Sequence, residues 1–224
     1  MKILSALGEL SGSFGDITAA RNKGGQYFRF RANPTNPQTA KQTLVRERLS
    51  QLSKNWSAVL SLAQRTSWKV FADTYSVIDT LGQSRNLTGI AMYNKLNGIL
   101  LNASQALIAD PPIDLEVSSS LTMAITAAVG GTNTVDFTYT PDPGADEVLY
   151  ISGVVNISAG INNVKNLRRF MGISGLAEAS PYTFTLPAEY GNLVTGQKVS
   201  FLVQRLDTTK GALSPGVVVE AIVT

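Results

Sequence analysis

Residues 121–139 read Leu-Thr-Met-Ala-Ile-Thr-Ala-Ala-Val-Gly-Gly-Thr-Asn-Thr-Val-Asp-Phe-Thr-Tyr. Apolar and polar residues alternate on both sides of Gly130-Gly131-Thr132-Asn133. A period of two is typical of a strand with one buried face, and a loop rich in Gly and Asn is typical of the turn between antiparallel strands. We therefore predict two consecutive strands, Leu121–Val129 and Thr134–Tyr139.

The same rhythm continues to the end of the chain, with further turn signals at Pro141-Asp142-Pro143-Gly144 and Thr208-Thr209-Lys210-Gly211. The remaining predicted strands are Val148–Ile157, Asn166–Ile173, Tyr182–Leu186, Val199–Leu206 and Val217–Val223. Seven strands in roughly 110 residues is the size of an antiparallel β-sandwich.

Upstream of this region, residues 39–104 favour helices because apolar residues recur every three or four positions. Thr39 with Gln42 and Ser61 with Gln64 fit capping boxes, and Thr88 is a third N-cap candidate. The predicted buried faces are Val45, Leu49, Leu52, Trp56 and Val59 on the first helix, Trp68, Phe71 and Tyr75 on the second, and Ile90, Tyr93, Leu96 and Leu100 on the third. We predict a small helical bundle whose two tryptophans pack on each other in its core.

Asp110-Pro111-Pro112 separates the two regions, because two prolines stop a helix and stiffen the chain. The predicted fold class is a multi-domain α+β chain. Its predicted parts are an extended basic arm (residues 1–37), a helical bundle (38–109), a Pro-Pro linker (110–114) and an antiparallel β-sandwich (115–224).

Five glycines interrupt every possible helix in the predicted arm, at positions 8, 12, 15, 24 and 25. Residues 26–31 alternate as one strand, with Tyr27, Arg29 and Arg31 on one face and Phe28 and Phe30 on the other. A glycine-rich stretch with a single two-faced strand cannot bury itself, so we expect it to become ordered against a neighbouring molecule. The alternative is a β-hairpin packed on the chain's own helices.

The charge is unevenly distributed along the chain. The net charge is +3, yet residues 1–110 hold 13 Lys and Arg against 6 Asp and Glu, whereas residues 111–224 hold 6 against 10. This asymmetry indicates either two domains or an arm that docks on an acidic partner. The candidate partner-binding residues of the arm are Arg21, Lys23, Tyr27, Phe28, Arg29, Phe30 and Arg31. The alternative partner is nucleic acid, bound by stacking and phosphate contacts.

The chain contains no cysteine and no histidine. Disulfides, thiolate chemistry and the commonest general base are therefore excluded within it. Asp142, Asp146 and Glu147 flank a Pro/Gly turn, and we interpret them as turn residues, with Ca²⁺ ligation as the alternative. We predict a non-enzymatic protein with no catalytic residues, no cofactor and no metal site. Residues 1–10 lack the apolar core of a secretory signal, and no apolar run is long enough to predict a membrane span.

An ordered series of residues extends over the first hundred positions: Ser11-Gly12-Ser13-Phe14-Gly15, Gly24-Gly25, Tyr27, Arg29, Arg31, Asn36-Pro37, Thr39, Gln42, Arg46, Trp56, Arg65, Trp68, Gly89 and Asn97. This series resembles a family of tailed-bacteriophage structural proteins. The segment Tyr190–Gln197, ahead of the strand Val199–Leu206, resembles the turn before the sixth strand of an immunoglobulin or fibronectin type III sandwich.

The resemblance implies a structural virion component, such as a capsid-associated decoration, neck or tail protein, made in the cytoplasm of a host bacterium. Its implied partners are capsid, neck or tail subunits and further copies of itself, with the sandwich displayed. Two alternatives stay open. The first is a module that binds a host surface protein or glycan through loop aromatics, with Phe170 and Tyr190 as candidates. The second is a nucleic-acid-binding packaging protein.

Overall fold

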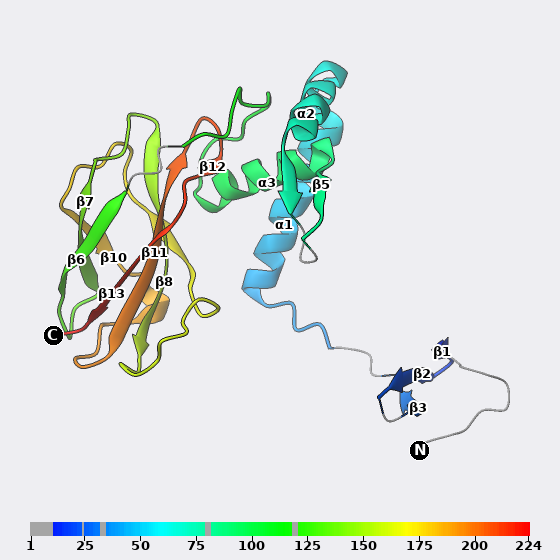
Figure 1. The fold of residues 1–224 in the computed structure, drawn as a ribbon, viewed down its shortest axis with the longest axis horizontal. Coiled ribbons are helices and arrows are strands. Elements are labelled where there is room, and N and C mark those ends of the chain that lie inside the picture. Colours follow the sequence, from blue (N-terminus) through cyan, green and yellow to red (C-terminus); the bar gives the residue numbers. More distant parts are fainter. Residues whose placement is uncertain (1–10, 24, 32–34, 79–81, 118–120) are drawn as a thin grey trace. The chain divides into compact units, whose positions relative to one another are not determined.

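The computed structural model describes residues 11–23, 25–31, 35–78, 82–117 and 121–224 (Figure 1). These residues form a mixed α+β protein with three α-helices and several antiparallel sheets. Contacts divide the chain into residues 1–44 and residues 45–224, which we call the N-terminal unit and the main unit. The predicted domain boundaries at residues 38, 110 and 115 stay a prediction, and the predicted arm lies outside the described residues at 1–10, 24 and 32–34.

The N-terminal unit contains a three-stranded antiparallel sheet in the order β1-β2-β3. The strands are β1 (Gly12–Phe14), β2 (Ile17–Asn22) and β3 (Gly25–Phe30). The strand predicted at residues 26–31 is thus confirmed as β3, whereas its surroundings, predicted as extended arm, form two more strands. The glycines explain the difference: Gly15 and Gly25 have φ values of 56° and 108°. They supply turn and strand-entry conformations that other residues disfavour.

The helices begin where the sequence places their caps. They are α1 (Ala40–Lys54), which continues into a π-helical turn (Asn55–Val59), α2 (Leu62–Thr74) and α3 (Gly89–Asn102). The backbone N–H of Gln42 donates to Thr39 Oγ1 at 3.4 Å, and that of Gln64 donates to Ser61 Oγ at 3.2 Å. Thr88 caps α3. A short hairpin of β4 (Ser76–Ile78) and β5 (Ser84–Asn86) lies between α2 and α3.

Tyr93 lies at the centre of the helical core. Its ring centroid is 5.5 Å from that of Trp56 and 5.4 Å from that of Trp68. The two tryptophans therefore pack through Tyr93 rather than on each other. Trp68 is fully buried, whereas Trp56 is partly buried against the same cluster.

The predicted face of α1 is only partly buried. Leu52 is buried, but Val45, Leu49 and Val59 are 62%, 55% and 72% exposed. The prediction that all three lie in the core is therefore wrong. Contacts with the helical cluster begin only at Leu52, so the two preceding turns of α1 keep an exposed apolar stripe.

Two antiparallel sheets follow, and all seven predicted strands are present. The first sheet has the order β10-β7-β6 and consists of β6 (Thr122–Ala128), β7 (Thr134–Thr140) and β10 (Tyr182–Thr185). The second has the order β12-β11-β8-β9, and β13 also pairs with β11. Its strands are β8 (Glu147–Ile157), β9 (Arg169–Ile173), β11 (Lys198–Asp207), β12 (Ala212–Leu213) and β13 (Val217–Ile222). A single 3-10 turn, Ala188–Tyr190, lies between β10 and β11.

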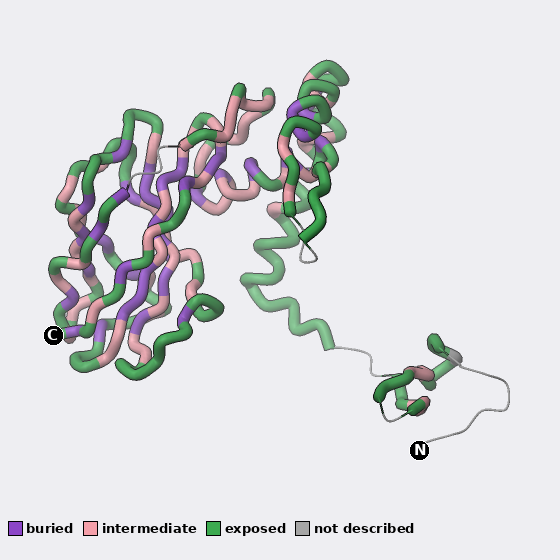
Figure 2. Tube along the Cα trace, in the orientation of Figure 1, coloured by how far each residue is buried: buried purple, intermediate pink, exposed green. Residues whose placement is uncertain are grey.

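The two sheets share one apolar core (Figure 2). Phe137 of β7 and Phe201 of β11 are both fully buried, with ring centroids 5.3 Å apart and planes at 88°. Ile151 of β8 and Phe184 of β10 belong to the same cluster. Side chains from both sheets thus interdigitate in one hydrophobic layer, which is what alternation with a period of two predicts.

The helices and the sheets are joined within the main unit. Leu100 of α3 and Ala103, which directly follows α3, form a buried cluster with Val148, Tyr150 and Leu206 of the second sheet. The fully buried side chain of Asn97 accepts a hydrogen bond from Ile108 N at 2.8 Å and donates to Ile108 O at 3.3 Å. The segment after α3 is therefore held against the helix.

Gly153 in β8 tests the packing of the sheet core. A Cβ at this position would lie 2.4 Å from a ring carbon of Phe201 and 3.1 Å from Met171 Sδ. We expect Gly153→Ala to lower the free energy of unfolding by about 1–3 kcal/mol, because the buried ring must shift. Gly98→Ala in α3 is the control, since a Cβ there meets nothing within 4 Å. It should be neutral or stabilising by about 0.5–1 kcal/mol. Urea denaturation measures both, and an unchanged midpoint for Gly153→Ala would contradict the packing.

Candidate protein-interaction surface

Strand register gives the N-terminal sheet one apolar face. Residues that pair directly across an antiparallel ladder project to the same side. Ile17 pairs with Phe30, and Ala19 pairs with Phe28. We call these four residues the apolar face. Arg21 pairs with Gln26 on the same side, so a cation stands at one end of this face.

The opposite face is polar and basic. Arg29 pairs with Thr18, and Tyr27 pairs with Ala20. Arg31 directly follows β3, and its backbone N–H donates to Asp16 O at 2.7 Å. We call Tyr27, Arg29 and, by continued alternation, Arg31 the basic face. The predicted separation of these residues from Phe28 and Phe30 is confirmed by the strand alternation.

The apolar face is uncovered within the sheet. Phe30 is 84% exposed and its partner Ile17 is 42% exposed. Between positions 11 and 31, no residue whose burial is described is buried (Figure 2). A sheet stabilises itself by packing its apolar face on a second layer, and three short strands alone do not supply one. The apolar face of this sheet is therefore left exposed to solvent.

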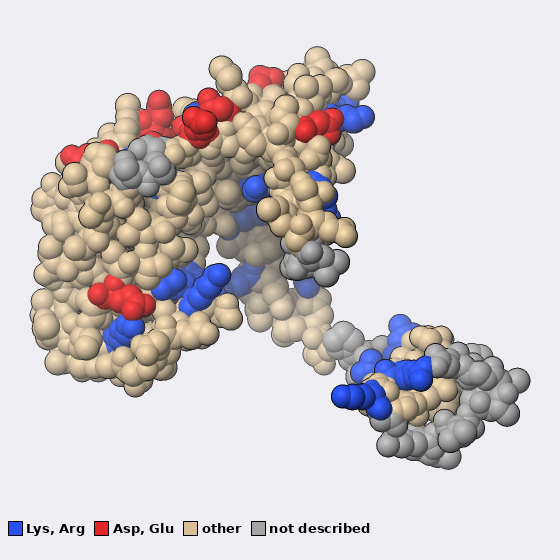
Figure 3. All heavy atoms as spheres, in the orientation of Figure 1, with Lys and Arg blue, Asp and Glu red and all other residues tan. Residues whose placement is uncertain are grey.

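The sheet is also strongly basic. Arg21, Lys23, Arg29 and Arg31 stand against Asp16, the one acidic residue among the described positions 11–31. Lys23 lies in the turn between β2 and β3. Figure 3 shows the blue side chains gathered on this sheet. The seven residues predicted to bind a partner therefore lie on one small sheet, but on both of its faces.

Ile17 and Ala19 complete the apolar face, and sequence reasoning missed them. Only one strand was predicted in this region, so nothing paired with Phe28 and Phe30. The available signal was the two-residue spacing Gly15-Asp16 between the strand ends Phe14 and Ile17, which is typical of a hairpin.

The two candidate glycan-binding aromatics are packed rather than exposed on loops. Phe170 lies in β9, and its ring stacks on Tyr150 with centroids 4.5 Å apart. Tyr190 is partly buried against the core of the sheets. Both rings are therefore partly packed within the main unit, and glycan binding through them stays a prediction.

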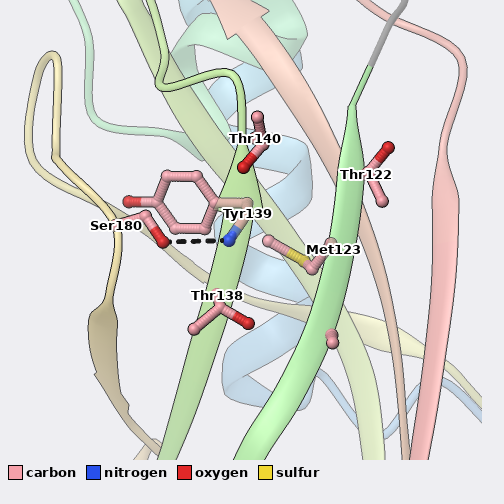
Figure 4. Close-up of a pocket in the computed structure, with 7 residues that line it drawn as sticks. Thr122, Met123, Thr138, Tyr139, Thr140 and Ser180 are labelled. Carbon is pink, nitrogen blue, oxygen red and sulfur yellow. Dashed lines mark hydrogen bonds between the residues drawn. The ribbon is translucent and has the colours of Figure 1, made fainter.

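A shallow hollow of about 190 Å³ lies on the outer side of β6 and β7 (Figure 4). Its lining is Thr122, Met123, Ala124, Thr138, Tyr139, Thr140 and Ser180. Tyr139 N donates to Ser180 Oγ at 3.0 Å, and the Tyr139 hydroxyl donates to Glu178 O at 2.9 Å. The hydroxyl groups that line the hollow are uncharged, and those of Tyr139 and Ser180 already form hydrogen bonds within the main unit.

The acidic residues at the β7–β8 turn tie loops together, as predicted for turn residues. Gly144 N donates to Glu147 Oε2 at 2.9 Å, and Ser180 N donates to Asp142 Oδ1 at 3.1 Å. Within the described ranges, no three acidic side chains are grouped so as to hold a metal ion. The helices described here include none that is both long and apolar enough to cross a membrane.

Tyr139 gives the main unit a pH-dependent stability. Burial, and then the charges of Asp142 and Glu178, raise the pKa of Tyr139 from 10.0 to about 12. The stabilisation by the neutral phenol is therefore complete below pH 10 and is lost as the pH rises toward 12. We expect Tyr139→Phe to be less stable by about 0.5–1.5 kcal/mol at neutral pH, because one hydrogen bond is lost. This deficit should shrink above pH 10. Urea titrations of both proteins across this range measure it, and a constant deficit would contradict the raised pKa.

Comparisons with known proteins assign this chain to no group. No family model matches it, and neither a curated protein nor a solved structure matches it. The functional argument therefore rests on the physical character of the N-terminal sheet and of the main unit.

Proposed function

We propose that this chain is a non-enzymatic structural component of a tailed-phage virion, as a capsid-associated decoration, neck or tail protein. It assembles through its N-terminal sheet and helices, and it displays an immunoglobulin-like sandwich. The observation that carries the proposal is the uncovered apolar face of the N-terminal sheet, with Phe30 84% exposed beside a strongly basic surface.

The energetics of such a contact suit assembly in many copies. Burial of apolar surface contributes about 25 cal/mol per Å², so one small sheet face provides a modest attachment. In a particle, repeated subunits add such contacts together, and the combined attachment becomes far stronger than each single one. A weak individual contact also lets subunits dissociate and correct their position during assembly.

The helices offer a second surface for neighbours. Val45 and Leu49 lie four residues apart on α1, a spacing that places them on the same helix face. Both are more than half exposed. This stripe supports assembly through the helices as well as through the N-terminal sheet.

The sheets of the main unit support the immunoglobulin-like part of the proposal. An antiparallel sheet of three strands and one of five share a single core. The segment from Tyr190 to Gln197 leads into β11, the long central strand that pairs with β8. Both features are expected of a sandwich of this type.

Protein is a better partner for the N-terminal sheet than nucleic acid. Phe30 projects to the apolar face and Arg29 to the basic face, since neighbours along a strand alternate. Binding a single nucleic-acid strand requires ring stacking and phosphate contacts on the same side. A face of Ile, Ala and Phe matches an apolar protein surface instead.

Incorporation into particles tests the proposal. Phage particles assembled with a chain lacking residues 1–31, or carrying Phe30→Ser together with Arg29→Glu, should contain little of this protein, because the contact surface is removed. Lys165→Glu changes an exposed position of the main unit. It is the matched charge control and should be incorporated normally. Quantitative immunoblotting of purified particles measures the content. Normal incorporation of the deleted chain would overturn the anchoring role.

A further inference from the structure

Antiparallel topology gathers acidic side chains at one end of the two sheets. At this end β7 and β11 finish, β8 begins, and the linker from α3 arrives. Seven acidic residues lie there, and we call this surface the acidic end: Asp114, Glu116, Asp142, Asp146, Glu147, Glu178 and Asp207. Figure 3 shows the red side chains along this edge of the main unit.

Hydrogen bonds and ion pairs connect the segments of the acidic end into one surface. Lys210 Nζ lies 2.6 Å from Asp114 Oδ1 and 3.9 Å from Asp207 Oδ2. Asp207 pairs with Glu147 across β11 and β8. Glu147 O in turn accepts from Ala177 N at 3.1 Å, next to Glu178. The linker, the β11–β12 turn, the β7–β8 turn and the loop before β10 are therefore contiguous.

The acidic end keeps an excess of negative charge. Its cations are Lys210, which lies against Asp114, and Arg205, which is 2% exposed and lies 3.8 Å from Glu147. Glu116, Asp142 and Asp146 are exposed to solvent. Crowded carboxylates repel one another, so a cationic partner stabilises this surface.

Two exposed apolar side chains lie within the same surface. Ile113, next to Asp114, is 98% exposed, and Leu176, beside Ala177, is 56% exposed. The acidic end therefore presents two uncovered apolar groups among its carboxylates.

The opposite end of the sheets also carries basic residues. Arg168 and Lys198 lie 3.6 Å and 2.5 Å from the carboxylate of Glu220. This single carboxylate offsets one of their two positive charges. Among the described positions 11–31, the N-terminal sheet carries Arg21, Lys23, Arg29 and Arg31 with one acidic residue, Asp16.

We infer that the partner of the N-terminal sheet is the acidic end of a second copy of this chain. Through the basic face and the adjoining β2–β3 turn, Arg29, Arg31 and Lys23 meet the carboxylates around Asp142 and Asp146. The inference rests on the proposed function and names one partner for the same surface.

This contact joins two different surfaces of identical chains, so it is heterologous. Heterologous contacts form closed rings where the rotation permits and open filaments where it does not. The mass of the assembly therefore rises with concentration. Salt weakens the contact, because the screening length falls from about 10 Å at 0.1 M to about 3 Å at 1 M.

Two charge-reversal variants, measured separately and as a mixture, test the inference. Sedimentation velocity of the full chain at low salt should show concentration-dependent association. Arg29→Glu with Arg31→Glu, and separately Asp142→Lys with Asp146→Lys, should each weaken self-association roughly tenfold or more. An equimolar mixture of the two double variants should associate again, because each variant retains one original surface and the reversed surfaces also attract.

Control variants change the same charges elsewhere. Asp73→Lys on α2 and Lys165→Glu at the opposite end of the sheets should associate like the parent. Phe30→Ser, on the opposite face of the N-terminal sheet, and Val70→Ser, at a 62% exposed position on α2, should also associate like the parent. Circular dichroism of every variant checks that the fold is retained.

Three outcomes would overturn the inference: a monomer at every concentration, association unaffected by salt or by either charge reversal, and a mixture that does not recover. Weakening by Lys165→Glu would instead place the contact at the basic end of the sheets and would also overturn it. Particle incorporation separates this inference from the proposed function. A chain that is monomeric in solution but depends on residues 1–31 for incorporation leaves the virion role intact.

Discussion

The main unit depends on the contact between α3 and its five-stranded sheet. Leu100 packs among Val148, Tyr150 and Leu206, and these apolar groups bury one face of the helix on the sheet. Gly211, with φ of 65°, allows the β11–β12 turn to approach α3 so closely that a Cβ there would lie 2.9 Å from Leu96 O. That turn also carries Lys210, which pairs with Asp114 of the linker. One contact therefore fixes the helices, the linker and the acidic end together.

The N-terminal unit lacks a comparable second layer. Its strands satisfy one another's backbone groups, since β2 pairs on both edges. Its side chains, however, have no described neighbour that covers them, and Phe30 is almost fully exposed. Backbone hydrogen bonds thus hold the three strands together, whereas burial of apolar side chains adds little to the stability of this sheet. A surface of this kind gains most from association, which is why the proposed role in an assembly follows from it.

Electrostatics adds direction to that association. Apolar contacts alone are not directional, and the exposed residues of α1 could attract many surfaces. A basic sheet and an acidic end favour one orientation, speed the encounter and disfavour pairing of like ends. Arg168 and Lys198 share the carboxylate of Glu220, whereas Asp142 and Asp146 are exposed to solvent.

The sequence by itself determined the local elements. Alternation gave seven of the eight strands of the two sheets, all but the short β12, and Thr39, Ser61 and Thr88 marked the helix starts, because caps and periodicity act over a few residues. Only the tertiary structure decided which apolar residues are covered: Leu52 is buried whereas Val45, on the same helix face, is not. It also placed Phe170 on Tyr150, paired Ile17 with Phe30, and brought Asp114, Asp142, Glu178 and Asp207 to one end. These outcomes depend on contacts between residues far apart in the chain, which local patterns do not encode.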